Sequence, residues 1–212
     1  MIVDKSGEAK FRAHFDVSRE TIDRLRIYYH LLHKWQNVKN LVSKNTINDA
    51  WFRHFADSAQ ILAHAPGARS WLDIGSGGGF PGMVLAILSL QNDSLARVIL
   101  VESDSRKCAF LREVARETGA NVEVACDRAE NVLPDAEGID VVTARAVAPL
   151  SQLVGLTYEL LAAGTIGLYM KGQDIGNELP EISKYSMLQA ELLQSKTDPN
   201  GKIVKVTKRR GD

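Results

Sequence analysis

The stretch WLDIGSGGGFPG at residues 71–82 constrains the fold of this chain more than any other segment. A short apolar run of β type leads into five glycines, and the apolar run PGMVLAILSL, of helical type, overlaps their end. Glycine is favoured where the backbone turns tightly or a ligand approaches it, and the first turn of a helix has N–H groups without an internal partner. The segment therefore predicts a strand–turn–helix unit whose turn binds a ligand.

After residue 70 the chain alternates short β-rich runs with helical runs. Expected helices follow the glycine turn and lie at 105–118 and 150–164, between expected strands at 71–74, 97–102, 122–125, 140–144 and 165–171. Nearly continuous apolar strands separated by helices are typical of a parallel sheet covered on both faces. The turn residues 198–201 predict a final antiparallel hairpin. We therefore expect an α/β fold with a Rossmann-like, mostly parallel, twisted sheet.

The first 65 residues have a helical pattern instead. Residues 1–16 are interpreted as a loose arm, and Ser18 is placed to cap a helix with apolar residues every three or four positions. Thr46 and Asp49 resemble a capping box before a second helical run that ends at residues 65–67. Because so short a segment rarely folds alone, we expect residues 1–65 to form a dependent helical cap on a domain of residues 66–212.

Composition excludes several classes of protein. The chain has 212 residues and no apolar run of the ~18–20 residues that span a bilayer, so we expect a folded cytoplasmic protein without membrane partners. Its formal net charge is zero, but residues 1–69 hold 11 Lys and Arg against 7 Asp and Glu, which indicates a weakly basic face. Cys108 and Cys126 form no metal-binding pattern, and both are interpreted as small core residues.

The spacing of the glycines is compatible with two kinds of ligand. Gly77, Gly79 and Gly82 satisfy the GxGxxG pattern of dinucleotide-binding proteins. Gly75, Gly77 and Gly79 instead give the GxGxG spacing of methyltransferases that use S-adenosylmethionine, and this register starts directly at the end of the strand. The second register is preferred for that reason.

Two further segments suit an adenosyl group. Glu102 ends the second expected strand, where its carboxylate can accept hydrogen bonds from both ribose hydroxyls. Ala129 and Glu130 follow the third strand, where an adenine ring would lie. These residues extend the predicted binding site beyond the glycine turn.

Six separated motifs together resemble one family. They are KWQNVKNLVS, RHFADS (53–58), DIGSGGGFPG (73–82), VESDSRKCAFL, TARAVAPL and MKGQ (170–173). Over roughly residues 15–175 the chain resembles the RsmG (GidB) family, bacterial methyltransferases of small-subunit ribosomal RNA. The resemblance implies the class I methyltransferase fold, the cofactor S-adenosylmethionine, and methylation of N7 of one guanine in 16S rRNA, in free RNA or a partly assembled subunit, by a monomer.

The resemblance also implies site residues. It assigns cofactor contacts to Gly75, Phe80, Ala129, Glu130 and Arg145. Together with the residues read from the glycine turn and the second strand, the full set of cofactor candidates is Gly75, Ser76, Gly77, Gly79, Phe80, Glu102, Ala129, Glu130 and Arg145. Arg145 is also the candidate catalytic residue, in a positioning role. Arg53 and His54, which share a helical face with Asp57 and Ser58, and Lys171 are candidate RNA contacts.

The expected chemistry is consistent with the residues that follow the fourth strand. N7 of guanine has an in-plane lone pair and no proton, so catalysis reduces to positioning and needs no general base. DVVTARAV lacks the Asp/Asn-Pro-Pro-aromatic motif of amino-group methyltransferases, and neither cysteine has the Pro-Cys context of pyrimidine C5 enzymes. Three alternatives stay open: a methyltransferase of another RNA or a small molecule, a nicotinamide-dependent oxidoreductase, and a cofactor-binding module without activity.

Overall fold

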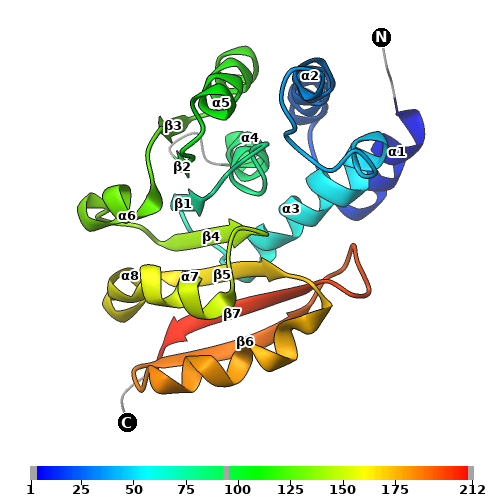
Figure 1. Cartoon of the computed structure of the whole chain (residues 1–212). Coiled ribbons are helices and arrows are strands. Elements are labelled where there is room, and N and C mark those ends of the chain that lie inside the picture. The colour runs from blue at the N-terminus through cyan, green and yellow to red at the C-terminus, as the bar shows by residue number, and fades with distance from the viewer. Residues whose placement is uncertain (1–3, 93–95, 210–212) are drawn as a thin grey trace.

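The chain folds around one seven-stranded sheet in the computed structural model, which describes residues 4–92 and 96–209 (Figure 1). The strand order is β3-β2-β1-β4-β5-β7-β6. The strands are β1 (Ser70–Ile74), β2 (Arg97–Val101), β3 (Val122–Ala125), β4 (Val141–Arg145), β5 (Ile166–Lys171), β6 (Leu188–Gln194) and β7 (Lys202–Lys208). The first five strands are parallel, and β7 pairs antiparallel with both β5 and β6. The predicted α/β class and the C-terminal hairpin are confirmed.

Helices cover both faces of the sheet (Figure 1). On one face lie α4 (Gly82–Asn92), α5 (Ser105–Thr118) and the helices that precede β1, packed in one apolar cluster. On the other face lie α6 (Ala129–Val132), α7 (Leu150–Leu156) and α8 (Tyr158–Ala163). The central strands β1, β2 and β4 are buried except at one end, because helices cover both of their faces. Among residues 4–92 and 96–209, no helix combines the length and apolar character needed to cross a bilayer.

The N-terminal arm is helical, and the interpretation of residues 1–16 as a loose arm is wrong for its described part. Helix α1 (Lys5–His14) begins after Asp4, whose side chain accepts a hydrogen bond from the Gly7 N–H at 2.8 Å. Phe11 is fully buried, with its ring centroid 5.7 Å from that of Trp51. This helix is stabilised by a tertiary contact with a residue 40 positions later, which local periodicity does not reveal.

Helix α2 (Arg19–Gln36) starts as predicted, because the Ser18 hydroxyl accepts a hydrogen bond from the Thr21 N–H. The capping box at Thr46 and Asp49 is wrong. Residues 47–49 form a 3₁₀ turn without a side-chain cap, followed by a π-helical turn at 51–56, α3 (Asp57–Ala59) and a 3₁₀ turn at 60–64. The Thr46 hydroxyl instead bonds to the ring of His54 at 2.9 Å.

Two smaller expectations are corrected. The single helix expected at 150–164 is interrupted at Thr157, whose hydroxyl donates to the Leu153 carbonyl and lies within hydrogen-bond distance of the Tyr169 hydroxyl. Cys126 is exposed, so its interpretation as a core residue is wrong, whereas Cys108 is buried. Cys126 lies one residue beyond β3, where the chain has already left the sheet.

Candidate active site at the carboxyl edge of the sheet

The candidate residues gather where the strand order reverses, beside the carboxyl ends of β1 and β4. This edge is the usual ligand site of open parallel sheets. Two adjacent cavities lie here, of about 480 Å³ and about 610 Å³. Four residues line both: Gly75, Glu102, Ser103 and Val147. The two cavities therefore meet at the first glycine of the turn.

The glycine turn has a backbone that other residues adopt only with strain. Gly75, Gly77 and Gly79 have φ values of +64°, +55° and +91°. A Cβ on Gly75 would lie 2.6 Å from a methyl group of Val147, so glycine there also keeps the space between the cavities open. Gly79 packs against Tyr28 and Met83 and lines neither cavity. Gly75 thus shapes the surface of the cavities, whereas Gly79 allows close packing on the other side of the turn.

Asp73, a residue of β1, stabilises the glycine turn through its carboxylate. It was not singled out from the sequence. Its carboxylate is fully buried, accepts hydrogen bonds from the Thr143 hydroxyl at 2.9 Å and the Gly82 N–H at 3.2 Å, and has its pKa raised by burial to about 6. Gly82 begins α4, where a Cβ would lie 2.8 Å from that of Asp73. A carboxylate inside the apolar strand WLDI is the sequence signal that could have found this residue.

The first cavity holds the residues predicted to bind an adenosyl group. Glu102 is buried beside the turn and accepts hydrogen bonds from the N–H groups of Gly77 at 2.9 Å and Asp104 at 2.8 Å. A carboxylate has about four acceptor positions, so acceptor capacity for two hydroxyls remains. Ala129 and Glu130, at the start of α6, line the same cavity. The fold thus places the first glycine of the turn, the end of β2 and the start of α6 around one cavity.

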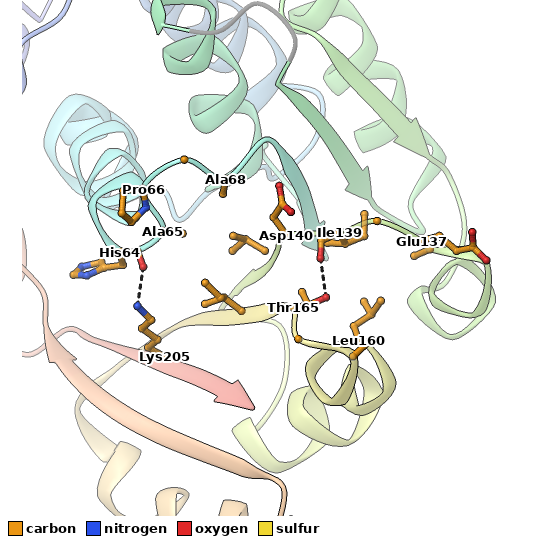
Figure 2. A pocket seen from close by; sticks show the side chains of 17 residues that line it. His64, Ala65, Pro66, Ala68, Glu137, Ile139, Asp140, Leu160, Thr165 and Lys205 are labelled. Carbon is orange, nitrogen blue, oxygen red and sulfur yellow. Dashed lines mark hydrogen bonds between the residues drawn. The ribbon is translucent and has the colours of Figure 1, made fainter. Parts of the chain in front are cut away.

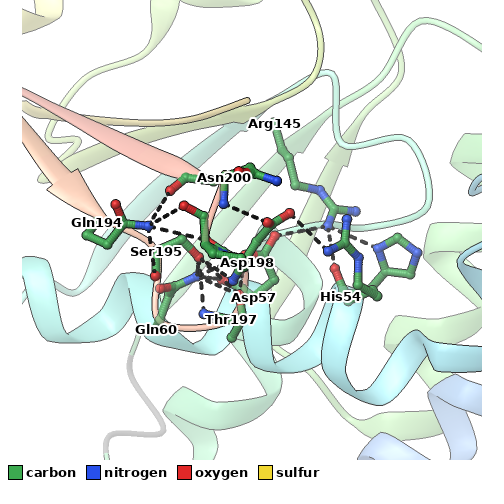
Figure 3. A network of polar contacts seen from close by, with 12 residues as sticks. His54, Asp57, Gln60, Arg145, Gln194, Ser195, Thr197, Asp198 and Asn200 are labelled. Carbon is green, nitrogen blue, oxygen red and sulfur yellow. Dashed lines mark hydrogen bonds and ion pairs between the residues drawn. The ribbon is translucent and has the colours of Figure 1, made fainter. Parts of the chain in front are cut away.

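Arg145 is the last residue of β4 and lines the second cavity (Figure 3). Its guanidinium lies over the Phe80 ring, with Cζ 4.8 Å from the ring centroid. Nη1 lies 3.1 Å from Nδ1 of His54 and 3.6 Å from a carboxylate oxygen of Asp57. The cation is thus held by an aromatic face, a neutral acceptor and an anion, which together fix its orientation.

His54 is buried, and it acts as an acceptor toward Arg145. Burial, together with the nearby charges of Arg145 and Arg53, lowers the pKa of its imidazole to about 3. The ring is therefore neutral near pH 7. Nδ1 accepts from Arg145, so Nε2 carries the proton and donates to the Thr46 hydroxyl. The ring also stacks on Phe80, with centroids 4.9 Å apart.

The remaining candidates are distributed as follows. Ser76 is buried and lines the second cavity. Arg53 lines it too, with a half-exposed side chain 2.9 Å from Asp198. Lys171 lines neither cavity, because its ammonium donates to the Ala148 carbonyl at 3.0 Å and pairs with Glu178 at 3.0 Å. Lys171 therefore supports the loop that follows β4.

That loop contains a second feature that the sequence did not reveal. Ala146 has φ +53°, and among the described residues it alone has a positive φ without being a glycine. Val147 follows it, with 43% of its surface exposed, and packs on Gly75 between the two cavities. Strained backbone next to an exposed apolar side chain is common at functional sites.

A larger cavity lies at the opposite edge of the sheet (Figure 2). It measures about 750 Å³ and is lined near the amino ends of β4 and β5. Two of its charged groups have partners within the fold: Asp140 accepts from the N–H groups of Arg69 and Ser70, and Lys205 donates to the His64 carbonyl. None of the candidate cofactor or RNA-contact residues lines it. Size alone therefore does not identify the site.

The family is decided by comparison with known proteins. The profile of the GidB family, described as rRNA small subunit methyltransferase G, matches residues 21–202. The chain belongs to this family. Relatives named Ribosomal RNA small subunit methyltransferase G include those of Methylorubrum populi, 49% identical over 91% of this chain and 90% of the relative, and Parvibaculum lavamentivorans, 48% identical over 92% and 87%. The resemblance drawn from the sequence is confirmed.

Solved structures agree on the fold. A methyltransferase from Geobacter sulfurreducens has a TM-score of 0.63 at 12% identity and covers 99% of this chain and 98% of its own. An O-methyltransferase from Bacillus cereus, solved in complex with S-adenosylhomocysteine, has a TM-score of 0.58 at 18% identity and covers 92% and 93%. The fold of this GidB-family protein is thus the Rossmann-like fold of S-adenosylmethionine-dependent methyltransferases.

Proposed function

We propose that this protein transfers a methyl group from S-adenosylmethionine to N7 of one guanine in 16S rRNA, as a monomer in the cytoplasm. The observation that carries the proposal is the pair of cavities that meet at Gly75, one bordered by Glu102 and the other by Arg145. The family and the names of its members support ribosomal RNA as the substrate.

The residues of the first cavity fit the cofactor. Glu102 would accept hydrogen bonds from the ribose hydroxyls, and Ala129 and Glu130 would border the adenine ring. Gly75 supports this assignment, because any side chain there would fill the junction of the cavities. Gly77 and Ser76 continue the same surface toward Arg145. When bound, S-adenosylmethionine supplies an electrophilic methyl group.

The residues of the second cavity suit a nucleophile that needs no proton removed. Its two carboxylates, Asp57 and Glu102, are already engaged by Arg145 and by backbone N–H groups. His54 donates and accepts within the protein. N7 of guanine reacts through a lone pair, so the task of these side chains is to orient the base and exclude water. Val147, apolar and between the cavities, would lie where base and methyl donor meet.

Arg145 would bind an anionic or electron-rich group, either the carboxylate of the cofactor or the target base or its phosphate. Its charge is held in place before a substrate arrives, because His54, Asp57 and Phe80 already surround it. Arg53, on the rim of the same cavity, would contact an RNA phosphate. Pre-set charge of this kind lowers the cost of reorganisation during the reaction.

The test is methyl transfer from labelled S-adenosylmethionine to small-subunit RNA from cells that lack this protein, with digestion to nucleosides and identification by mass. We expect label in 7-methylguanosine with the wild-type protein and at least a tenfold slower reaction with Arg145→Ala, on the order of the loss expected when a positioning contact is removed. Label in another nucleoside would refute the N7 assignment. Full activity of Arg145→Ala would refute its role.

A further inference from the structure

A polar network joins the loop between β6 and β7 to Arg145 (Figure 3). Asp57 lies at its centre. One of its carboxylate oxygens lies 3.6 Å from Arg145 Nη1, and the other accepts hydrogen bonds from Thr197 Oγ1 at 2.7 Å and Gln60 Nε2 at 2.9 Å. Because each oxygen has its own partners, the orientation of the carboxylate is fixed from both sides.

Further contacts tie the hairpin loop to the helical segment 51–60. The Lys196 N–H donates to Gln60 Oε1 at 2.8 Å, and Gln60 Nε2 donates to Thr197 Oγ1 at 3.2 Å. Asp198 pairs with Arg53 at 2.9 Å. Thr197 is 8% exposed, which is low for a residue at the tip of a hairpin. The loop is therefore held against the segment that carries Asp57.

Arg145 depends on Asp57 more than on its other direct partners. Burial lowers the pKa of its guanidinium, and the charge of Asp57 is the largest influence that raises it. His54 is neutral and Phe80 offers only a ring face, so Asp57 supplies the negative charge among the groups that touch the cation. A buried cation without a counter-charge is strongly destabilised and moves toward water.

We propose that Asp57 and Thr197 are positioning residues for methyl transfer: the β6–β7 loop orients Asp57 through the Thr197 hydroxyl, and Asp57 in turn holds Arg145 at the cavity. This inference rests on the proposed function. It gives the C-terminal hairpin a role in the active site, although its loop lies about 50 residues from Arg145 in the sequence and lines neither cavity.

The test compares Thr197→Val, which keeps the shape and removes the hydroxyl, with the matched variant Thr207→Val. Thr207 lies on β7 in the same hairpin, where its hydroxyl accepts an exposed hydrogen bond from Gln189 at 3.2 Å. We expect kcat to fall on the order of tenfold in Thr197→Val and to stay unchanged in Thr207→Val. The Nε–Hε signal of Arg145, assigned by its absence in Arg145→Lys, should shift in the ¹H–¹⁵N spectrum of Thr197→Val alone.

A double-mutant cycle separates positioning from general destabilisation. On an Asp57→Asn background, Thr197→Val should lower kcat by much less than tenfold, because the Asp57 carboxylate that connects Thr197 to Arg145 is already absent. An equal cost on both backgrounds, an unchanged kcat, or an unmoved Arg145 signal would overturn the proposal. The spectrum is recorded without RNA, so it tests the effect of Thr197 on Arg145 independently of activity. If the wild-type protein transferred no methyl group, the proposed function would be refuted, but the spectrum would still test the positioning of Arg145.

Discussion

His54 illustrates how one buried residue links the site to stability. Its pKa is lowered by burial to about 3, against an ordinary value near 6.5 in the unfolded chain. Between these pH values the unfolded state binds more protons, so this residue makes the folded state lose stability as pH falls from about 6.5. Asp73 acts in the opposite sense, because burial raises its pKa to about 6 and protonation then favours the folded state.

We therefore predict that His54→Gln reduces the loss of stability between pH 7 and pH 5. Urea unfolding at several pH values measures this, since the difference between variant and wild type removes the contribution of Asp73. His14→Gln, which replaces an exposed imidazole, is the matched control. An unchanged pH dependence in His54→Gln would show that the ring is not held neutral in the folded protein.

Gly75→Ala tests the junction of the two cavities. The residue has φ +64°, which costs a non-glycine residue about 1–2 kcal/mol, and its Cβ would displace Val147. Gly67→Ala is a matched control, because Gly67 has φ +82° with open space around it. We predict a loss of stability in both variants, larger in Gly75→Ala because of the contact with Val147, and an affinity for S-adenosylhomocysteine that falls more than tenfold only in Gly75→Ala. Calorimetry measures the affinity, and equal affinities would contradict the account.

The sequence predicts the role of a single residue best where the neighbouring residues in the chain determine that role. The glycine turn, Glu102 and Arg145 stand at strand ends, so alternation of strands and helices places them at one edge. Val147 and Thr197 were not predicted, because their roles depend on contacts across the fold. Asp57 was recognised as part of a polar helical face, but its bond to Thr197 joins residues 140 positions apart.

Among the secondary-structure elements, helix α2 stabilises the glycine turn. The Tyr28 hydroxyl donates a hydrogen bond to the Gly78 carbonyl, and its ring packs against both Phe55 and Phe80, with centroids 5.1 and 5.4 Å away. The turn is thus held by a helix that precedes it by about 50 residues.

We predict that Tyr28→Phe lowers the free energy of unfolding by about 1–3 kcal/mol, since it leaves a buried carbonyl unpaired. Tyr158→Phe is the control, because the Tyr158 hydroxyl makes an exposed contact with Met187, and its cost should stay below about 0.5 kcal/mol. Chemical denaturation measures both. Equal costs would mean that the bond to Gly78 contributes nothing to the stability of the fold.

Elements with strong periodicity were predicted and the others were not. The five parallel strands are short apolar runs bounded by turn residues, and each was found from sequence. Helix α1 and the mixed 3₁₀ and π turns at 47–64 depend on how Trp51 and Phe55 fit the core. Tertiary packing overrides local preference at such places.

Across the whole molecule, the N-terminal helices and the sheet share one apolar cluster, in which Tyr28 contacts Phe80 and Phe110, and Phe55 contacts Phe80. We predict that a fragment of residues 66–212 does not unfold cooperatively, because it would expose the apolar faces of α4 and α5. Circular dichroism during urea titration, with the full chain alongside, checks this. A cooperative transition in the fragment would contradict the dependence of the two parts on each other.

The proposed function requires the two cavities at the carboxyl edge to form one methyl-transfer site. A crystal structure with bound S-adenosylhomocysteine tests this requirement. We expect the ribose hydroxyls on Glu102, the adenine beside Ala129 and Glu130, and the sulfur facing the second cavity past Gly75 and Val147. A ligand bound at the opposite edge, in the cavity lined by Asp140 and Lys205, or bound without contact to Glu102, would contradict it.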